Sequence, residues 1–243
     1  MLNLSTAIPA ALFALGAGTA CAGDFADREV IGFSPDGRYF AFEEYGVQDG
    51  SGFPYSNIYV IDVEGDSWLP GTPVRVLMED EQLELDEARD RALEQASPKL
   101  DDLAIAVEPV HVASNPVTQL NADFNFVLVN PRIVVPPIDN PYAFKLSTYA
   151  LPAGADYCAD FGETKGFQLD LIHGKDDRIV SLQRDERLPQ SRGCPLDYQI
   201  ADVYTYYPDG GQPVFAVLVR MIQVGFEGPD GRYIAIAGPL PAE

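Results

Sequence analysis

The chain has 243 residues, 47% of them hydrophobic and 22% charged, which is typical of a globular protein and excludes a disordered or fibrous one. Its 16 Lys and Arg residues against 37 Asp and Glu residues give a formal net charge of −21 at pH 7. Such a polyanion repels nucleic-acid phosphates and anionic lipid headgroups, so we expect no nucleic-acid partner.

The first segment has the features of a secretion signal. Residues 1–22 carry no charged side chain, and an apolar run over residues 7–17 precedes the small-x-small pattern Ala20-Cys21-Ala22. This arrangement predicts a signal peptide over residues 1–22, cleaved between Ala22 and Gly23, and a single β-rich domain over residues 23–243. The apolar run is too short to cross a bilayer, so we expect no transmembrane segment. The expected location is periplasmic or secreted, with a lipid anchor through Cys21 as the alternative.

Short strands are expected over most of the remaining chain. Residues 28–33 and 38–45 alternate apolar and polar side chains on either side of Ser34-Pro35-Asp36-Gly37, a sequence that favours a tight turn, and this predicts a β-hairpin. The same pattern predicts further strands over residues 57–63, 74–78, 124–129, 142–151, 166–172, 179–183, 197–207, 214–224 and 232–237.

One helix is expected among these strands. Residues 81–96 are strong helix formers, and Leu85, Ala88, Ala92 and Ala96 recur at the helical spacing of three or four. We expect the helix to end at Ser97-Pro98, because a residue that precedes proline disfavours the α conformation.

The fold class follows from this count and from an internal repeat. The sequence PDGRYFAF over residues 35–42 recurs as PDGRYIAI over residues 229–236. It resembles the hairpin of TolB-like and WD40-like β-propeller blades, a tight turn followed by a strand with one buried face. A four-bladed propeller needs about sixteen strands, and about eleven are expected here. The sequence therefore predicts a mainly β fold, an antiparallel β-sandwich or open barrel with one inserted helix, and an irregular small β-propeller is the alternative.

Two cysteines remain once the leader is removed. Cys158 and Cys194 form an even pair in a chain expected to reach an oxidising compartment, which predicts a disulfide between them. The alternative is two buried free thiols.

Candidates for catalysis are few. His111 and His173 are the only histidines, so any histidine chemistry must use one of them. Gly65-Asp66-Ser67 with Asp170 and His173 resembles two signatures of GDSL-type esterases, but the other blocks of that family are missing and its fold alternates strands and helices. We therefore predict no catalytic residue, and a small hydrolase that uses His111 or His173 is the alternative.

Metal and cofactor sites are not expected. The chain has acidic clusters, such as Glu79-Asp80-Glu81, but none has the Asp-x-Asp-x-Asp-Gly spacing that supplies calcium ligands from one loop. We predict no cofactor and no metal site, and an envelope calcium-binding protein stays as a further alternative.

Binding residues are sought among scarce cations and clustered aromatics. Arg187, Arg192 and Tyr198 are expected near the Cys158–Cys194 disulfide, where positive charge is rare in this acidic chain. Tyr204 and Tyr206 lie two residues apart on one expected strand, which places both rings on one face. This face either stacks on a ligand or packs in the core.

Several segments resemble a bacterial family of predicted secreted proteins of unknown function. The resemblance rests on the opening hairpin, on Gly166-Phe167-Gln168-Leu169 and on residues 113–118, 188–195 and 226–230. It implies an exported single-domain protein and supplies no activity. We therefore expect a non-enzymatic binding or interaction module for an unknown ligand or envelope protein.

Overall fold

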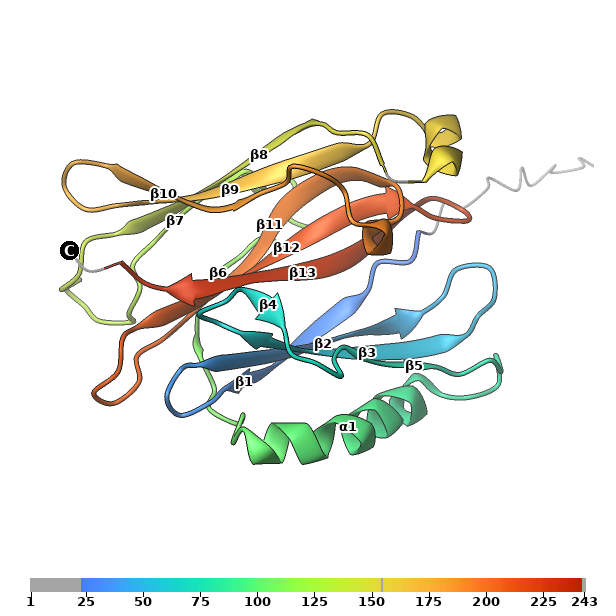
Figure 1. Cartoon of the computed structure of the whole chain (residues 1–243), viewed down its shortest axis with the longest axis horizontal. Helices are drawn as coiled ribbons and strands as arrows, with labels where there is room; N and C mark the ends of the chain where they lie inside the picture. Colours follow the sequence, from blue (N-terminus) through green and yellow to red (C-terminus); the bar gives the residue numbers. More distant parts are fainter. Residues whose placement is uncertain (1–22, 154, 242–243) are drawn as a thin grey trace, which may run out of the picture.

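Thirteen β-strands and one α-helix form the computed structural model, which describes residues 23–153 and 155–241 (Figure 1). The expected leader, the cleavage residues Ala20 and Ala22, and the alternative anchor Cys21 lie outside the described residues. Among the described helices, none is long and apolar enough to span a bilayer.

Three antiparallel sheets contain all the named strands. The N-terminal sheet has the order β1-β2-β3-β4, with β5 also paired to β3, and comprises β1 (Asp27–Phe33), β2 (Tyr39–Val47), β3 (Pro54–Asp62), β4 (Ser67–Trp68) and β5 (Val74–Leu77). The central sheet has the order β13-β12-β11-β6 and comprises β6 (Val110–Ser114), β11 (Pro195–Tyr206), β12 (Val214–Val224) and β13 (Pro229–Pro239). The outer sheet has the order β10-β9-β8-β7 and comprises β7 (Phe126–Val129), β8 (Tyr142–Ala150), β9 (Lys165–His173) and β10 (Arg178–Arg184).

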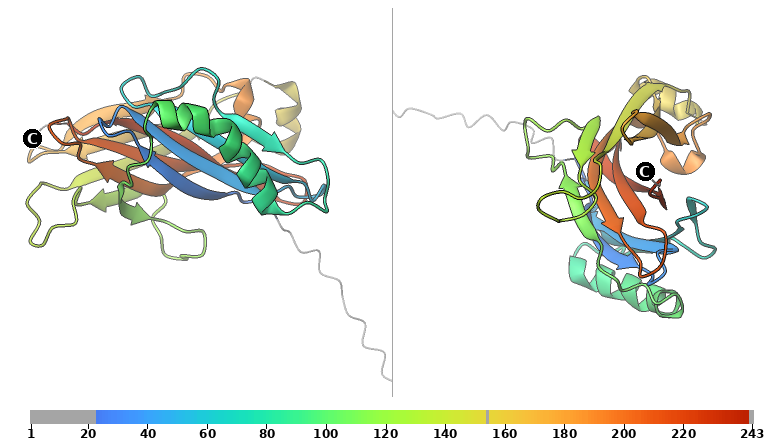
Figure 2. Two further views of the ribbon diagram at one scale, coloured as in Figure 1. Left: turned by 90° about the horizontal axis from the view of Figure 1, so that it is seen from below. Right: turned by 90° about the vertical axis from the view of Figure 1, so that its left-hand side faces the viewer.

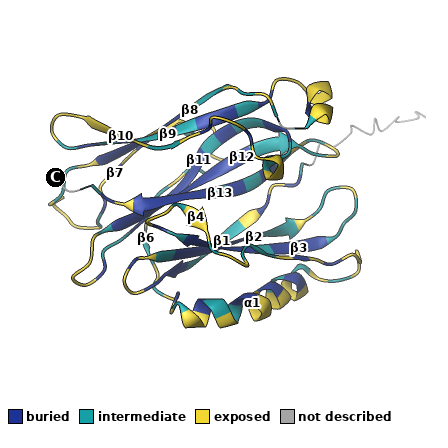
Figure 3. Ribbon diagram, in the orientation of Figure 1, coloured by how far each residue is buried: buried dark blue, intermediate teal, exposed yellow. Residues whose placement is uncertain are grey.

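The three sheets are stacked in layers, with the central sheet between the other two (Figures 1 and 2). Phe215 and Val217 of β12 belong to the core shared with the outer sheet, whereas Ala216 and Leu218 belong to the core shared with the N-terminal sheet. Because both faces are covered, β12 is buried over eight consecutive residues (Figure 3). The prediction of a mainly β sandwich is confirmed, with a third sheet added to the two layers. The strands are not arranged as the radial blades of a propeller.

Helix α1 (Leu85–Asp102) covers the free face of the N-terminal sheet. The prediction that it ends at Ser97-Pro98 is wrong, because it continues through Pro98. Pro98 cannot donate to the carbonyl of Glu94, and the Ser97 hydroxyl donates to that carbonyl instead, at 3.0 Å. The extra turn also buries Leu100, four residues after Ala96.

The repeated octapeptide takes two conformations. In the first copy Ser34 and Gly37 close the expected turn, and the N–H of Gly37 donates to the Ser34 carbonyl at 2.9 Å. The second copy lies entirely within β13, so the turn expected there is wrong. Gly231 explains the difference, because its N–H donates to Asp24 at 2.9 Å and its carbonyl accepts the Ala26 N–H at 3.0 Å, which keeps it extended.

The remaining expected elements agree closely with the structure. All of the expected strands are present, and β4 and β6 are additional. A disulfide joins Cys158, in the 3-10 helix η1 (Asp156–Phe161), to Cys194 directly before β11, as predicted. It anchors the loop that carries the short 3-10 helix η2 (Gln190–Arg192).

Candidate functional site

A groove of about 530 Å³ runs along the free edge of β13. Strand β13 is an edge strand because it pairs with β12 on one side only. One wall of the groove comes from β3, β4 and β5 of the N-terminal sheet, and the other from β10 and η2. In Figure 1, β13 crosses the middle of the molecule between β4 and β10. We call this feature the β13 groove.

The backbone of β13 is only partly hydrogen-bonded on its groove side. The N–H of Tyr233 donates to Glu44 Oε2 and the N–H of Ala237 donates to Asp66 Oδ1, both at 2.9 Å. Because strand N–H groups alternate in direction, the N–H of Ala235 points to the same side. No described residue accepts it, and no described donor reaches the carbonyls of Tyr233, Ala235 or Ala237.

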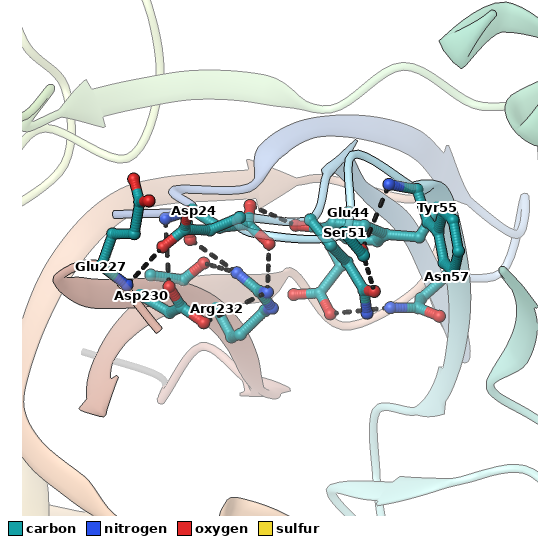
Figure 4. Close-up of polar contacts among 12 residues, drawn as sticks. Asp24, Glu44, Ser51, Tyr55, Asn57, Glu227, Asp230 and Arg232 are labelled. Atoms are coloured by element: carbon teal, nitrogen blue, oxygen red, sulfur yellow. Dashed lines mark hydrogen bonds and ion pairs between the residues drawn. The ribbon is translucent and has the colours of Figure 1, made fainter. Parts of the chain in front are cut away.

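Glu44 is a fixed part of the groove floor. Its side chain is buried and accepts a hydrogen bond from Asn57 Nδ2 at 3.1 Å (Figure 4). It also accepts hydrogen bonds from the Tyr59 hydroxyl at 2.8 Å and from the Tyr233 N–H. Burial and the neighbouring Glu44 carboxylate raise the pKa of Tyr59 well above its ordinary value, so this hydroxyl remains a neutral donor.

Arg232, which lines the groove, belongs to a polar cluster around Asp24 (Figure 4). Arg232 Nη2 lies 2.5 Å from Asp24 Oδ2, and Asp24 Oδ1 accepts the Tyr55 hydroxyl at 3.0 Å. Asp230 accepts the backbone N–H of Asp24 at 3.0 Å. These bonds hold the segment 24–26 against Gly231, where a Cβ atom would lie 2.5 Å from the Phe25 ring. A larger residue at 231 would displace the Phe25 ring.

Asp66 also lines the groove and lies in the turn between β3 and β4. Its φ of +42° is in the left-handed region, which Asp tolerates better than most residues. Burial raises its pKa to about 6, although the hydrogen bond from the Ala237 N–H favours the carboxylate. A partly desolvated carboxylate therefore faces the groove near neutral pH.

The wall from β3, β4 and β5 combines aromatic rings with a cation. Trp68 is the only tryptophan in the sequence, is 46% exposed, and packs on Tyr59 with ring centroids 5.5 Å apart. Arg75 is exposed and lies 5.9 Å from the Trp68 ring, and no carboxylate of the described residues forms an ion pair with it. A second hollow of about 280 Å³ shares Asn57, Arg75 and Arg232 with the groove.

The opposite wall contains Arg192, a residue singled out from the sequence. Its Nη1 lies 2.5 Å from Oδ2 of the buried Asp185, and its guanidinium carbon lies 5.2 Å from the Phe167 ring. Burial opposes the charge, but the hydrogen bond to Asp185 raises the pKa of Arg192 above its ordinary value. The positive charge of Arg192 is thus already paired.

The other predicted binding residues are dispersed. Arg187 is exposed and does not line the groove. Tyr198 is fully buried next to Phe167, with ring centroids 4.6 Å apart, and burial raises its pKa to about 12. Tyr204 and Tyr206 share one face, as expected, and pack against the core between the central and N-terminal sheets. A ligand contact by any of these residues stays a prediction.

The two histidines lie apart. His111 is on β6, where its Nε2 lies 2.9 Å from Oδ1 of the buried Asp202, whose Oδ2 also pairs with Arg28 at 2.7 Å. Burial opposes ionisation of Asp202, but the His111 hydrogen bond and the Arg28 charge lower its pKa. His173 is on β9 of the outer sheet and is buried. Neither histidine lines the groove.

No group of three or more His, Cys, Asp or Glu side chains in residues 23–153 and 155–241 could hold a metal ion. The calcium alternative therefore stays an untested prediction.

The fold and groove define a class, a layered mainly β protein with a partly open edge strand in a groove. The chain belongs to the family described as "Predicted secreted protein (DUF2259)", whose model matches residues 41–238. The matched range includes the groove from Glu44 to Ile236. This confirms the resemblance to a family of predicted secreted proteins. No curated protein matches the chain.

Sequence reasoning missed most of the groove. Glu44, Asp66, Arg75 and Arg232 come from four separate strands or turns, and only the fold brings them together. The one local signal was Trp68, a single tryptophan directly after a Gly-Asp-Ser turn.

Proposed function

We propose that this protein is an exported, non-enzymatic binding module whose ligand site is the β13 groove, acting in the periplasm or outside the cell after removal of residues 1–22. The observation that carries the proposal is the edge of β13, where the Ala235 N–H and the carbonyls of Tyr233 and Ala235 face a groove of about 530 Å³ without described partners. That volume is within the usual range for ligand sites.

Export is supported by two observations. The family is described as predicted secreted, and the Cys158–Cys194 disulfide is of a kind that persists in oxidising compartments.

A binding role is favoured over catalysis because the charged groups of the groove are mostly engaged in holding the structure. Glu44 accepts hydrogen bonds from three groups, and Arg192 and Arg232 are paired with Asp185 and Asp24. Arg75 and the face of Trp68 are left to contact a ligand.

Trp68 supplies the experiment, because its fluorescence reports on the groove without a label. Purified mature protein is titrated with defined sets of free amino acids, short peptides and oligosaccharides. We expect at least one set to change the Trp68 emission saturably, and the charge reversal Arg75→Glu to weaken that response. Arg91→Glu, which reverses an exposed charge on α1 outside the groove, is the matched control and leaves the response unchanged. No response from any set, or an equal response in Arg75→Glu, contradicts the proposal.

The hydrolase alternative has its own test. Esterase, peptidase and phosphatase substrates are screened against the wild type and against His111→Ala and His173→Ala. Turnover that disappears with either substitution contradicts a non-enzymatic role.

A further inference from the structure

We infer that the ligand of the β13 groove is an extended peptide that joins the central sheet as a strand on β13 and places an acidic residue against Arg75. The inference rests on the proposed function, because it assigns the chemical class of ligand to the same groove.

The edge of β13 already binds an extended segment of this chain. Phe25 forms a parallel bridge with Gly231, and the backbone of residues 24–26 exchanges two hydrogen bonds with Gly231, at 2.9 and 3.0 Å. The open part of the edge begins at Tyr233, two residues further along. A peptide bound there continues an interface that the first described residues have started.

The open groups have the spacing of a strand. The carbonyls of Tyr233 and Ala235 point to the groove, and that of Ala237 continues the same edge beyond it. They recur at every second residue, a repeat of about 6.5–7 Å that matches the N–H groups on one side of an extended peptide. Ala235 also offers its N–H, so it can form a doubly hydrogen-bonded pair with one peptide residue. The carboxylates of Glu44 and Asp66 already occupy the flanking N–H groups. The empty edge therefore presents mainly acceptors and favours a ligand with regularly spaced donors.

The groove offers a different surface on each side of a strand added to β13, so it can accept the alternating side chains of an extended peptide. Tyr59 and Trp68 line the groove on the side of the N-terminal sheet, whereas Ile234 and Ile236 of β13 face the core of the outer sheet. Successive side chains of an added strand point to opposite sides. In this mode of recognition the backbone hydrogen bonds provide affinity and the alternate pockets provide specificity.

Charge selects the kind of peptide. Arg192 and Arg232 are paired with buried carboxylates, so their charges are compensated. Arg75 is exposed beside Trp68 and lacks a carboxylate partner among the described residues. An Asp or Glu side chain, or the terminal carboxylate of the peptide, complements it.

The test selects peptides from a random heptapeptide library displayed on phage, with the mature wild-type protein as bait. We expect binders that contain an acidic residue, and synthetic copies that change the Trp68 emission. Selection on Arg75→Glu is expected to favour Lys or Arg in place of the acidic residue, while Arg91→Glu, on α1, selects the same peptides as the wild type. A swapped preference also shows that the Arg75→Glu variant is folded.

Backbone methylation of a selected peptide tests strand pairing without altering the protein. N-methylation at every second residue, on the side facing β13, is expected to weaken binding at least about tenfold, and N-methylation of the intervening residues to leave it nearly unchanged. Equal effects at both sets of positions overturn strand addition and leave the groove as a peptide site. If an oligosaccharide or a free amino acid, but no peptide, changes the Trp68 emission, the inference is overturned and the proposed function stands. If nothing binds, both are overturned.

Discussion

The carboxylate of Asp66 accepts a hydrogen bond of 2.9 Å from the N–H of Ala237, across 171 residues of sequence. This contact joins a turn of the N-terminal sheet to the edge strand of the central sheet. Unpaired N–H groups on a sheet edge attract other strands, and proteins commonly cover them. Asp66 and Glu44 cover two such groups on β13 and leave the stretch at Ala235 open. The same two carboxylates therefore limit where a ligand can pair.

Replacing Asp66 by Asn is expected to stabilise the protein at pH 7. The pKa of Asp66 is raised in the folded state, so the protonated side chain stabilises the fold. This stabilisation is fully present below pH 3.8 and is lost as the pH rises through about 6. Asn keeps an oxygen acceptor for Ala237, tolerates the positive φ and carries no charge to desolvate. A tenfold change in proton affinity corresponds to about 1.4 kcal/mol, so we expect a gain of about 1–3 kcal/mol at pH 7.

Urea unfolding at pH 7 and at pH 4 measures this effect. The gain in unfolding free energy should be present at pH 7 and small at pH 4. Glu64→Gln removes an exposed negative charge from the same turn and should change little at either pH. An equal gain in both variants, or no pH dependence in Asp66→Asn, contradicts the assignment.

Removal of Asp202 is expected to be strongly destabilising. Its carboxylate is buried and pairs with Arg28 and His111, so Asp202→Ala leaves Arg28 without its partner and costs about 3–5 kcal/mol. Because the pKa of Asp202 is lowered in the folded state, its contribution is present above pH 3.8 and is lost as the pH falls through the folded value.

Thermal unfolding between pH 7 and pH 3 tests this dependence. The wild type should lose more stability on acidification than Asp202→Ala does. Asp197→Ala, on the same strand, removes a half-buried partner of Lys165 and is expected to cost about 0–1 kcal/mol. Similar losses in the two variants would show that the Asp202 pairing is unimportant.

Pro98→Ala is expected to raise the free energy of unfolding by about 1–3 kcal/mol. Pro98 lies inside α1, where proline lacks a helical N–H and disfavours the helix, and alanine restores the bond to the Glu94 carbonyl. Calorimetric melting measures the change. A lower melting temperature in Pro98→Ala contradicts a helix that continues through this residue.

Loss of the disulfide is expected to destabilise the whole chain. Cys158 and Cys194 are 36 residues apart, and the chain-entropy model gives about 3–4 kcal/mol for a loop of that length. The double substitution Cys158→Ser and Cys194→Ser should lower the urea midpoint by the corresponding amount. Reductant should lower the midpoint of the wild type and leave the double variant unchanged. If reductant leaves the urea midpoint of the wild type unchanged, this expectation is contradicted.

Local patterns were sufficient for most of the fold and insufficient for the groove. Alternation of apolar and polar residues identifies the opening hairpin, and the two cysteines identify their disulfide, because these signals depend on neighbours in sequence or on a single pair. The turn predicted at the second copy of the octapeptide is absent, because Gly231 pairs with a segment more than 200 residues away in the sequence. No local pattern indicates that pairing. The helix does not end before Pro98, because the Ser97 hydroxyl replaces the hydrogen-bond donor that proline lacks and Leu100 adds buried area.

The groove could not be predicted because its walls belong to different sheets. In the sequence Glu44 resembles an ordinary surface acid, and Asp66 is notable only within an esterase-like Gly-Asp-Ser pattern. The role of both depends on the edge of β13 lying beside them. Arg192 was identified because a scarce cation near a disulfide is visible in the sequence. Its pairing with Asp185 was not visible.

The measurement closest to the central claim is the hydrogen-exchange rate of the Ala235 amide, with and without a peptide selected on the wild type. If the ligand binds in the β13 groove, this amide exchanges freely in the protein without ligand and is strongly protected in the complex. The amide of His111, on the opposite edge strand, is unaffected. Protection near His111 with no change at Ala235, in a complex that demonstrably forms, contradicts the groove as the ligand site.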